Sequence, residues 1–498
     1  MSQVFTQPSM SLAQLFSSMP SVPLTQSAKN IVITGMSLDS RQIKTNELFI
    51  AVKGEGVDGH NYIEQAINAG AVAVISERIV ESTFACPVIV MPEIKQQLSV
   101  LAGYFYQQPS KKLTVIGVTG TNGKTSCTQI ISQWLTLIGK RCAVMGTLGT
   151  GIGEDIQASV NTTPDAISVQ KLLWQWQQQA VDCVAMEVSS HGIDQGRVTG
   201  VEFATAVFTN LSRDHLDYHE TMQHYAETKA RLMQWPKLRA AVINSDDQYA
   251  PQMLKGIADD VKVYPFSLIN RACDVFPEEV RFQRDGIRAR INTPWGELQI
   301  NSQLLGGFNL QNIMAALICL LELGEPLEAL EWTAAAIKPI RGRMELIENK
   351  QDISVVVDYA HTPDALEQAL TALRKHSGNK QLVCLFGCGG DRDQGKRALM
   401  AEVAVRCADR VWITSDNPRS ENPERIIKQI QAGAGKAKQV SIEIDRAIAI
   451  NKAIVTAEAG DVVLLAGKGH ENYQLIAGKK YPFSDAEQAK LALEKRAA

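Results

Sequence analysis

Gly117-Val118-Thr119-Gly120-Thr121-Asn122-Gly123-Lys124-Thr125 is the stretch of this sequence that decides its fold class. It follows an apolar, β-branched run at 113–118 and leads into residues 126–137, whose pattern predicts a helix. A strand, a glycine-rich turn and a helix beginning at Lys-Thr are typical of a phosphate-binding loop. In such a loop backbone N–H groups cradle the phosphates, the lysine reaches the terminal ones, and the threonine hydroxyl faces Mg²⁺. The strict spacing would place glycine at 118, where this chain has valine, so a surface turn ending in Gly-Lys-Thr by chance stays an alternative. We expect a nucleoside triphosphate site.

The size and charge of the chain narrow the classes of protein it can belong to. Its 498 residues exceed what one hydrophobic core organises, so about two to four domains are expected. Hydrophobic residues make up 45% and charged residues 21% of the chain, as in ordinary globular proteins. The formal net charge of -3 provides no overall field that would favour nucleic acid or an anionic membrane as a partner. A small anionic substrate would therefore need local cationic residues.

The cysteines and the N-terminus indicate the compartment. The nine cysteines are scattered, odd in number and never spaced as Cys-x-x-Cys. We therefore predict reduced cysteines in the core of a cytoplasmic protein, in preference to disulfides or a zinc site. The N-terminus lacks a basic segment followed by an apolar one, and no apolar run is as long as a membrane-spanning helix. These features predict a soluble chain without membrane insertion, and a monomer is the expected state.

The chain divides into three α/β blocks, which we place at 1–110, 111–340 and 341–498. In the first block, short strands are predicted at 48–52, 71–75 and 88–90, with a helix at 63–69. The polar segment 107–112, which carries a proline, marks its end. Strands of the central block are predicted at 113–118, 183–188, 205–208 and 240–243, and those of the third block at 354–357, 382–386, 410–413 and 462–465. Alternation of strands with helices predicts parallel sheets covered on both faces, the third block being Rossmann-like.

Polar residues directly after the central strands are the first candidates for chemistry, because ligands bind at the carboxyl ends of parallel strands. Glu187 opens Glu187-Val188-Ser189-Ser190-His191 and is placed to hold Mg²⁺, with a loop cap as the alternative. His215 and His219 could form a zinc pair on one helix face, but no third ligand accompanies them. A single histidine serving the nucleotide's metal is the preferred interpretation. Lys229, taken alone, has the pattern of an ordinary surface lysine.

Three strand ends of the third block combine cationic and acidic residues. They are Asp358 to Asp364, Asp416-Asn417-Pro418-Arg419, and Gly467-Lys468-Gly469-His470-Glu471. With the segment 387–393 they would gather Arg392, Arg419 and Glu471 at one sheet edge. Two guanidinium groups and a carboxylate suit a zwitterionic amino acid, because the guanidinium takes carboxylate and the carboxylate takes ammonium. A salt-bridge network between loops is the equal alternative.

Together these residues resemble the Mur ligase family of cell-wall enzymes, over nearly the whole chain. The resemblance rests on several motifs in the family's order: Gly120-Thr121-Asn122-Gly123-Lys124-Thr125, Glu187-Val188-Ser189-Ser190-His191, Asn210 to His215, Gly307-Phe308-Asn309-Leu310-Gln311-Asn312, and Gly342-Arg343-Met344-Glu345. The phosphate loop of this family has the same spacing, so the valine at 118 agrees with the family's pattern. Asp416-Asn417-Pro418-Arg419 resembles the motif by which one branch of the family recognises meso-diaminopimelate.

The resemblance implies an ATP and Mg²⁺ site. Contacts to ATP are implied for Gly120, Thr121, Asn122, Gly123, Lys124, Thr125, Ser126, Asn309, Arg343 and Asp358. Catalytic duty is implied for Lys124, Glu187, His215 and Lys229, and the metal contacts for Thr125, Glu187, His215 and Lys229. Lys229 matches the lysine that the family carbamylates, which converts a cation into an oxygen ligand for the metal.

The resemblance also implies two substrate sites and a uridine-binding N-terminal domain. A UDP-linked muramoyl dipeptide would be held by Leu38, Ser40, Glu55, Gly56, Val57, Asn161, Thr162, Thr163, Ser189, Gln195 and Arg197. The 55–57 loop departs from relatives that carry histidine and glutamine there, so only its backbone is expected to contribute. Diaminopimelate would be held by Arg392, Asp416, Asn417, Pro418, Arg419, Gly467 and Glu471.

The implied reaction has two steps. The substrate's glutamate γ-carboxylate attacks the γ-phosphate of ATP, and the amine of diaminopimelate then displaces phosphate from the acyl phosphate. Closure of the third domain on the second is expected, because Arg343 and Asp358 lie outside the loop's domain. An L-lysine-adding ligase and a folylpolyglutamate synthase are alternatives within the superfamily, and a nucleotide-switched binding protein is the alternative from another class.

Overall fold

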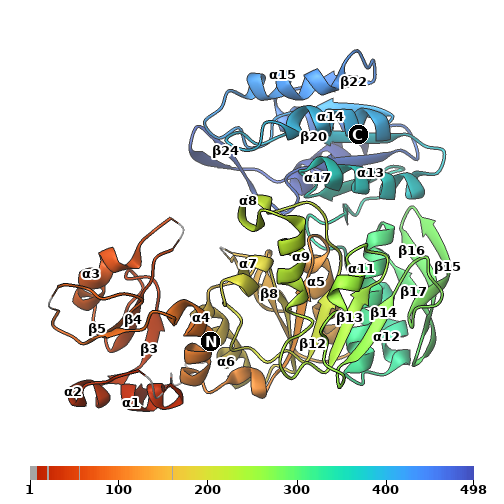
Figure 1. Cartoon of the computed structure of the whole chain (residues 1–498). Coiled ribbons are helices and arrows are strands. Elements are labelled where there is room, and N and C mark those ends of the chain that lie inside the picture. Colours follow the sequence, from red (N-terminus) through yellow and green to blue (C-terminus); the bar gives the residue numbers. More distant parts are fainter. Residues whose placement is uncertain (1–7, 20–21, 55, 83, 160, 498) are drawn as a thin grey trace. The chain divides into compact units, whose positions relative to one another are not determined.

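The computed structural model describes residues 8–19, 22–54, 56–82, 84–159 and 161–497. These residues form two compact units, one made of the described residues up to Phe266 with Ala315–Gly324, and the other of Ser267–Met314 with the described residues from Glu325 onward. Each unit is built around its own sheets, and Figure 1 labels their elements. The fold is α/β throughout, as the sequence predicts.

The first unit begins with a small parallel sheet in the order β3-β4-β5-β6. Its elements are β3 (Gly35–Ser37), β4 (Glu47–Ala51), α3 (Ile63–Asn68), β5 (Ala71–Ser76), β6 (Val88–Val90) and α4 (Ile94–Phe105), preceded by β1 (Met10–Ser11), α1 (Leu12–Leu15), α2 (Gln26–Lys29) and β2 (Val32–Ile33). Every residue of β4 is buried, which explains the apolar run that follows Glu47. Helix α4 packs on α6 (Ala166–Gln178) of the next sheet (Figure 1). Trp174 of α6 belongs to the same hydrophobic cluster as the N-terminal residues.

The central sheet has eight strands in the order β10-β9-β8-β11-β7-β12-β13-β14. Its strands are β7 (Thr114–Thr119), β8 (Cys142–Gly146), β9 (Gly149–Ile152), β10 (Asp155–Gln157), β11 (Cys183–Glu187), β12 (Thr205–Phe208), β13 (Ala240–Asn244) and β14 (Lys262–Phe266). Its helices are α5 (Lys124–Leu137), α6 (Ala166–Gln178), α7 (Ser190–Asp194), α8 (Leu216–His219), α9 (Met222–Ala230) and α10 (Ala250–Met253). The strands from β8 to β14 in this order pair in parallel, so their carboxyl ends share one edge.

One feature of this sheet departs from a purely parallel expectation. Strands β9 and β10 extend it as an antiparallel hairpin beyond β8. Strand β7 lies in the interior between β11 and β12, where an added side chain at Gly117 would come within 2.9 Å of the Phe203 ring. The phosphate-loop strand is therefore buried on both sides, which holds the start of the loop rigidly.

The second unit contains an antiparallel sheet that the sequence pattern did not reveal. Its strands are β15 (Phe276–Gln283), β16 (Gly286–Thr293) and β17 (Gly296–Ser302), followed by α11 (Gly307–Glu322) and α12 (Leu327–Thr333). Buried and exposed residues alternate along β16 and β17, as expected for a sheet with one solvated face. His376 of α13 (Pro363–Ser377) joins this sheet to the C-terminal part: its Nδ1 lies 2.6 Å from the carbonyl oxygen of Gln283, and its Nε2 accepts from the backbone N–H of Gly306.

The C-terminal sheet has six strands in the order β18-β19-β23-β20-β21-β22. Its elements are β18 (Glu345–Leu346), β19 (Ser354–Asp358), α13 (Pro363–Ser377), β20 (Leu382–Phe386), α14 (Lys396–Cys407), β21 (Arg410–Ile413), α15 (Pro423–Ala434), β22 (Val440–Ile442), α16 (Arg446–Val455) and β23 (Val462–Ala466), followed by β24 (Tyr473–Ile476), β25 (Lys479–Pro482) and α17 (Asp485–Ala497). All pairs are parallel except β18 with β19. Separate hydrophobic clusters cover the two faces, which confirms the predicted layers.

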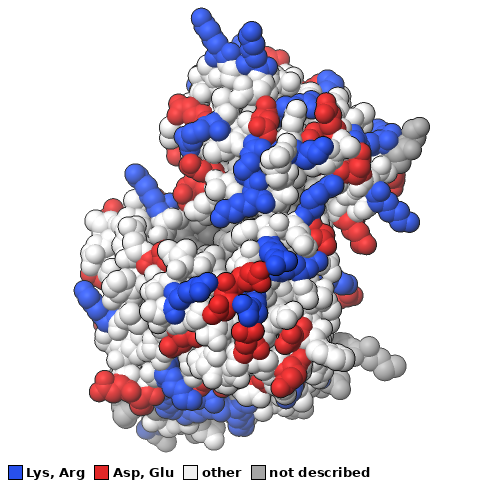
Figure 2. Space-filling view, turned by 90° about the vertical axis from the view of Figure 1, so that its right-hand side faces the viewer, with Lys and Arg blue, Asp and Glu red and all other residues white. Residues whose placement is uncertain are grey.

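The state of the cysteines, the character of the helices and the surface charges were also predicted from the sequence. All nine cysteines are free and seven are buried, which confirms the prediction of reduced core cysteines. Across the part of the chain that the structure describes, we find no helix with the length and apolar character needed to cross a membrane. Lysine and arginine side chains mingle with aspartate and glutamate on the face seen in Figure 2, in keeping with the small net charge.

Candidate functional site

The phosphate loop joins β7 to α5 and is shaped by two glycines. Gly120 has φ 149° and Gly123 has φ 84°, conformations that side-chain-bearing residues rarely adopt. A Cβ at Gly120 would lie 1.9 Å from the Thr209 hydroxyl, so only glycine leaves room there. The ammonium group of Lys124 donates to the carbonyl oxygens of Gly120 and Thr121, each over 2.8 Å. The predicted strand, turn and helix are therefore present, with the helix beginning at Lys124.

The segment after β12 holds this loop from one side. Asn210 accepts from the backbone N–H of Thr121 through its carbonyl and from that of Asn122 through its side chain, both over 2.9 Å. The Thr209 hydroxyl donates to the Asn122 carbonyl over 2.6 Å. Because β12 is the neighbour of β7 in the sheet, the Asn210 motif lies against the loop and fixes its backbone.

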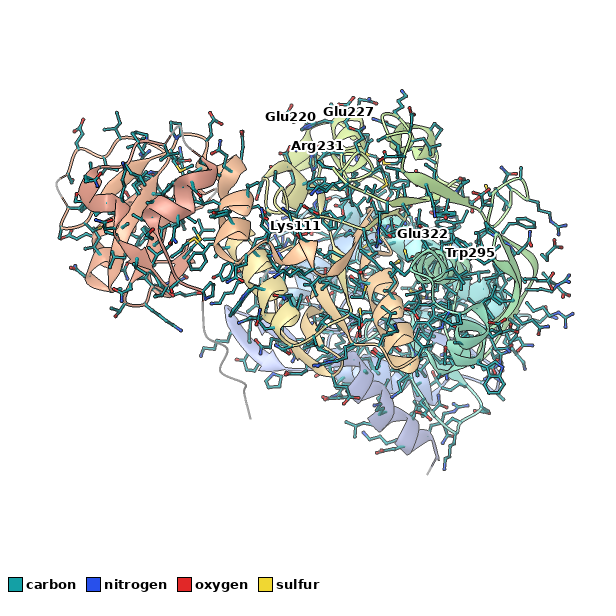
Figure 3. The ribbon with its side chains drawn as sticks, turned by 90° about the horizontal axis from the view of Figure 1, so that it is seen from below. Lys111, Glu220, Glu227, Arg231, Trp295 and Glu322 are labelled. Atoms are coloured by element: carbon teal, nitrogen blue, oxygen red, sulfur yellow. The ribbon has the colours of Figure 1, made fainter. Side chains whose placement is uncertain are left out.

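Lys229 of α9 is buried, with 1% of its surface exposed, so the interpretation as an ordinary surface lysine is wrong. Its ammonium group donates to the Gly120 carbonyl over 2.8 Å and lies 4.7 Å from the centroid of the Tyr225 ring. Burial, assisted by the nearby Lys124 charge, places the pKa of Lys229 well below its ordinary value. Glu227 and Arg231, which are exposed, mark the outer side of this segment in Figure 3.

Glu187 ends β11 and is a buried residue, 1% exposed. One oxygen accepts from the backbone N–H of Thr147 over 2.8 Å, and the other accepts from the Thr147 hydroxyl over 3.1 Å. A Cβ at Gly146 would lie 2.1 Å from the first oxygen, so the end of β8 passes directly over the carboxylate. Glu187 thus caps the loop after β8, and each carboxylate oxygen keeps a lone pair for a further contact.

His215 and His219 occupy different environments. His215 is about half exposed, and burial of the rest of its ring lowers its pKa against the opposing pull of Asp214. His219 is fully buried, its Nε2 lies 2.9 Å from the Ser190 hydroxyl, and its pKa falls to about 4, mainly through burial. Within the described residues no group of three or more His, Cys, Asp or Glu side chains is arranged to hold a metal ion. The zinc-pair alternative therefore finds no support.

The residues predicted for the peptide end of the substrate form one hydrogen-bonded group. Thr163 donates to the carbonyl of Glu187 and lies 3.0 Å from the Ser189 hydroxyl, while Arg197 donates to the carbonyl of Thr163 over 2.8 Å. Arg197 also donates to the side-chain oxygen of Gln195. Thr162 joins the group through the Thr147 hydroxyl at 3.0 Å, and the Asn161 carbonyl accepts from Ser159. The fold thus brings these residues next to Glu187.

The residues predicted for the uridine end lie in the N-terminal sheet. Ser40 is buried and donates to the side chain of Gln65 over 3.2 Å, and Leu38 is half-buried in the N-terminal core. Val57 is 60% exposed, and its carbonyl accepts from Gly54 across the turn that contains Gly56. Glu55 lies outside the described residues.

The predicted amino-acid site is assembled at the carboxyl ends of β20, β21 and β23. The Asn417 amide donates to Glu471 over 2.8 Å. A Cβ at Gly467, where φ is 112°, would lie 2.8 Å from the Asp416 carboxylate. Arg419, with φ 53°, donates to the Gly390 carbonyl over 2.7 Å. The structure therefore brings Asp416, Asn417, Arg419, Gly467 and Glu471 together.

Arg392 lies on the loop after β20 and is exposed. That loop is anchored by Arg397, whose buried guanidinium donates to the Gly389 carbonyl over 3.0 Å and pairs with Glu421 at 2.8 Å. Glu421 in turn accepts from the backbone N–H of Asp391 over 2.6 Å, and the pKa of Glu421 falls to about 2, chiefly through Arg397. The loop is fixed while its guanidinium at 392 faces solvent, a suitable arrangement for capturing a carboxylate.

Asn309, Arg343 and Asp358, predicted to contact ATP, belong to the second unit. The side chain of Asn309 is engaged with the Leu305 carbonyl and with Asn312. Arg343 lies 4.9 Å from the Tyr359 ring centroid, and its buried Nε has no hydrogen-bond partner within the described chain. Asp358 accepts from the backbone N–H groups of Met344 and Ala360, and burial raises its pKa.

Sequence reasoning assigned no role to several residues that shape these sites. Lys468 lies inside a quoted motif, yet its burial among the amino-acid residues was not foreseen. Tyr225 approaches the Thr121 hydroxyl at 3.2 Å, and Thr147 binds Glu187. A lysine between two glycines at the end of an apolar strand is the one signal that could have identified Lys468.

Most of the chain matches known proteins. Residues 118–320 match the Mur ligase middle domain, residues 342–469 the Mur ligase glutamate ligase domain, and residues 32–104 the catalytic domain of the Mur ligase family. The UDP-N-acetylmuramoyl-L-alanyl-D-glutamate–2,6-diaminopimelate ligase of Pseudomonas syringae pv. tomato is 48% identical over 467 residues, 93% of this chain and 95% of the relative. The same-named enzyme of Pseudomonas aeruginosa is 47% identical over 487 residues, 97% of this chain and 98% of the relative.

A solved structure agrees with the sequence matches. It is described as a UDP-N-acetylmuramoyl-L-alanyl-D-glutamate–2,6-diaminopimelate ligase, with a TM-score of 0.75 and 38% identity. The similarity covers 98% of this chain and 100% of the other. With the phosphate loop, the buried lysine beside it and the arginine-and-acid site of the C-terminal sheet, these matches lead to one conclusion: the chain belongs to the Mur ligase family.

Proposed function

We propose that this protein is an ATP-dependent ligase of peptidoglycan precursor synthesis. It adds meso-2,6-diaminopimelate to the D-glutamate γ-carboxylate of UDP-N-acetylmuramoyl-L-alanyl-D-glutamate. The observation that carries the proposal is that relatives 47–48% identical over nearly the whole chain bear this enzyme's name, while the chain keeps Asp416-Asn417-Pro418-Arg419 beside Glu471.

The nucleotide part of the proposal rests on the loop at 120–126. The left-handed glycines expose backbone N–H groups, and the loop ends in the positive N-terminus of the 14-residue helix α5. Gly120, Thr121, Asn122, Gly123, Lys124, Thr125 and Ser126 would surround the phosphates. Lys124 would exchange its two carbonyl partners for phosphate oxygens. Asn309, Arg343 and Asp358 would bind the remainder of ATP, and the half-buried ring of Tyr359 packs against the Arg343 guanidinium.

The donor set near the loop suits Mg²⁺, which prefers oxygen ligands. Glu187 keeps lone pairs beyond its bonds to Thr147, and Thr125 is a buried hydroxyl-bearing residue in the first turn of α5. Thr125, Glu187, His215 and carbamylated Lys229 would hold the ion, directly or through water. Once bound, Mg²⁺ would neutralise charge on the phosphates as the γ-phosphoryl group is transferred.

Carbamylation of Lys229 is supported by its environment. A carbamate forms when a neutral amine attacks CO₂, and burial keeps this amine neutral to lower pH than an exposed lysine. The product would place an anion beside Gly120 and the Lys124 ammonium group, where the buried amine stood. A mass increment of one CO₂ on the peptide that carries Lys229, lost in mild acid, would test the modification.

The chain's own residues would act by positioning and electrostatics. Thr162, Thr163, Ser189, Gln195 and Arg197, joined by hydrogen bonds next to Glu187, would hold the peptide end of the UDP-substrate. Leu38, Ser40, Gly56 and Val57 would hold the uridine end. Arg392 and Arg419 would take carboxylates of diaminopimelate, and Glu471 would take an ammonium group. Domains at 1–110, 111–340 and 341–498 are proposed to bind the UDP-substrate, ATP and the amino acid; a cytoplasmic monomer is proposed.

The alternatives explain less of the chain. A folylpolyglutamate synthase needs no uridine domain, yet residues 32–104 match a Mur ligase domain. A lysine-adding ligase would be expected to lack Asn417. A nucleotide-switched binding protein needs no amino-acid pocket.

One assay separates these alternatives. The purified chain is given ATP, Mg²⁺ and radiolabelled UDP-muramoyl dipeptide, with either meso-diaminopimelate or L-lysine. We expect ADP, phosphate and a labelled UDP-tripeptide with diaminopimelate only. Product with lysine alone would reassign the substrate, and no product with either amino acid would reject the ligase.

A further inference from the structure

Lys468 is a buried cation that the proposed reaction leaves without a role. It follows β23, between Gly467 and Gly469, and its side chain is 0% exposed. Its ammonium group lies 2.9 Å from Glu471 Oε2, 3.2 Å from Asn417 Oδ1 and 3.8 Å from Asp416 Oδ1. Removal of an ammonium group from water is unfavourable unless charges and hydrogen bonds compensate, so these three partners explain why it is tolerated.

Hydrogen bonds to Glu471 are distributed unevenly between its two oxygens. Lys468 and the Asn417 amide both donate to Oε2, over 2.9 and 2.8 Å. Oε1 receives no hydrogen bond from the residues that the structure describes, and the Glu471 side chain is 18% exposed. One carboxylate oxygen is therefore held by the protein, and the other is available to a ligand.

The side-chain amide of Asn417 makes hydrogen bonds in the same network. Its Oδ1 accepts from Lys468 and from the backbone N–H of Leu475, over 3.2 and 2.9 Å, while its Nδ2 donates to Glu471. Both lone pairs of the amide oxygen are thus in use. Asn417 braces Glu471 and Lys468, so the orientation of the pocket carboxylate depends on the lysine as well as on the asparagine.

The charges near Lys468 show what it contributes. Asp416 and Glu471 both lie at this strand end, and the lysine is the cation within 4 Å of both. Without it, two carboxylates would repel each other across a partly desolvated site. With Lys468 in place, the side chains of Asp416, Glu471 and Lys468 together carry one net negative charge. That charge complements one ammonium group of the substrate.

We propose that Lys468 is a positioning residue of the amino-acid pocket: it holds Glu471 by Oε2 and balances Asp416, so that Glu471 Oε1 receives the ammonium group of the incoming amino acid. The inference rests on the proposed function, because it assumes that this pocket binds diaminopimelate. Lys468 acts through Glu471 and Asn417 and needs no contact with substrate. Its loss should therefore weaken use of the amino acid and spare the formation of the acyl phosphate.

The test separates the two half-reactions of one protein. Hydroxylamine attacks an acyl phosphate directly, forming an acyl hydroxamate and releasing phosphate, and it does not need an amino-acid pocket. The full-length parent, Lys468→Met and the matched control Lys428→Met, an exposed lysine of α15, are compared. Each is assayed with ATP and the UDP-substrate, once with hydroxylamine and once with increasing diaminopimelate.

For Lys468→Met we expect the KM for diaminopimelate to rise by about tenfold to a hundredfold, as for loss of one charged hydrogen bond. Hydroxamate formation and the KM values for ATP and UDP-substrate should stay within about twofold of the parent. Lys428→Met should match the parent throughout. An unchanged KM for diaminopimelate, or an equal loss of hydroxamate formation, would overturn the positioning role.

If Lys468→Met does not fold, Lys468→Arg is tested in its place. It keeps the charge but moves the donors, so a raised KM for diaminopimelate with normal hydroxamate formation is expected, and an unchanged KM would count against the proposal. Failure of the proposed function has a different outcome. The parent itself would then form neither the diaminopimelate product nor the hydroxamate.

Discussion

Lys124 and Lys229 donate hydrogen bonds to the same atom, the carbonyl oxygen of Gly120, each over 2.8 Å. The Nζ atoms of two lysines thus meet at one backbone oxygen of the phosphate loop. The positive charge of Lys124 is one cause of the lowered pKa of Lys229. This relationship couples the loop lysine, which would serve the phosphates, to the buried lysine, which would be carbamylated.

Replacement of Lys124 by alanine should abolish turnover and leave binding of the UDP-substrate intact. The side chain would stabilise developing charge on the transferred phosphoryl group, so we expect kcat to fall by about 10³-fold. Calorimetry would measure the UDP-substrate affinity. The control is Lys111→Ala, an exposed lysine of the same unit (Figure 3). Parental turnover in the Lys124 variant would exclude the loop from catalysis.

Replacement of Lys229 by methionine should stabilise the unmodified protein in CO₂-free buffer. The folded-state pKa of Lys229 lies below its ordinary value of 10.5. Between these two values the unfolded chain carries a proton that the folded chain lacks, so the stability of the parent rises with pH. The advantage of the variant should therefore be largest near neutral pH and shrink toward pH 10.5. Thermal unfolding of the variant and the parent at several pH values measures this advantage. A stability difference that does not change with pH would contradict the prediction.

His219 should make the protein less stable as the pH falls. Its pKa is about 4 in the folded chain against an ordinary value of 6.5. Between pH 6.5 and about 4 the unfolded histidine binds a proton that the buried ring refuses, so stability decreases as the pH falls through this window. His219→Gln should lose less stability than the parent between pH 7.5 and pH 5 in urea unfolding. An equal loss in both proteins would assign the effect to other groups.

The buried pair of Arg446 and Asp485 should be costly to break. Both side chains are 0% exposed and 2.6 Å apart, and Arg446 also donates to the carbonyls of Ser415 and Ala466. Arg446→Met would leave the Asp485 carboxylate buried without its cation. We expect this change to lower the free energy of unfolding by about 3–5 kcal/mol. Arg446→Met with Asp485→Leu should recover part of it. The exposed Arg425→Met is the control, and denaturant unfolding is the measurement.

Gly120→Ala should inactivate the protein through a clash rather than through backbone strain alone. Its Cβ would overlap the Thr209 hydroxyl at 1.9 Å, which displaces the Asn210 segment that holds the loop. Gly139 also has a positive φ, 84°, but its Cβ would meet nothing within 4 Å. Gly139→Ala should therefore cost only about 1 kcal/mol and keep full activity. Equal activity of the two variants would contradict this account.

Much of the fold follows from local pattern. Residues 205–208, 382–386 and 410–413 were predicted as strands with their observed bounds, because short apolar runs between polar turns need no distant information. The hairpin β9–β10 and the sheet β15–β17 were missed. Their side chains alternate or are only partly buried, and their pairing depends on neighbours that a local pattern does not specify.

The sequence by itself determined the chemistry of this protein: Gly120 to Thr125 indicates phosphate binding, and the motifs at 187–191 and 416–419 indicate the family. Only the tertiary structure decided where charges are buried. The sequence pattern of Lys229 is that of a surface lysine, and no burial was foreseen for Lys468, because burial depends on which helices and strands pack around a side chain, and those contacts come from residues far away in the chain. The physical reason is that the pKa of a lysine, or the orientation of the carboxylate it holds, depends on desolvation and on partners brought together by folding.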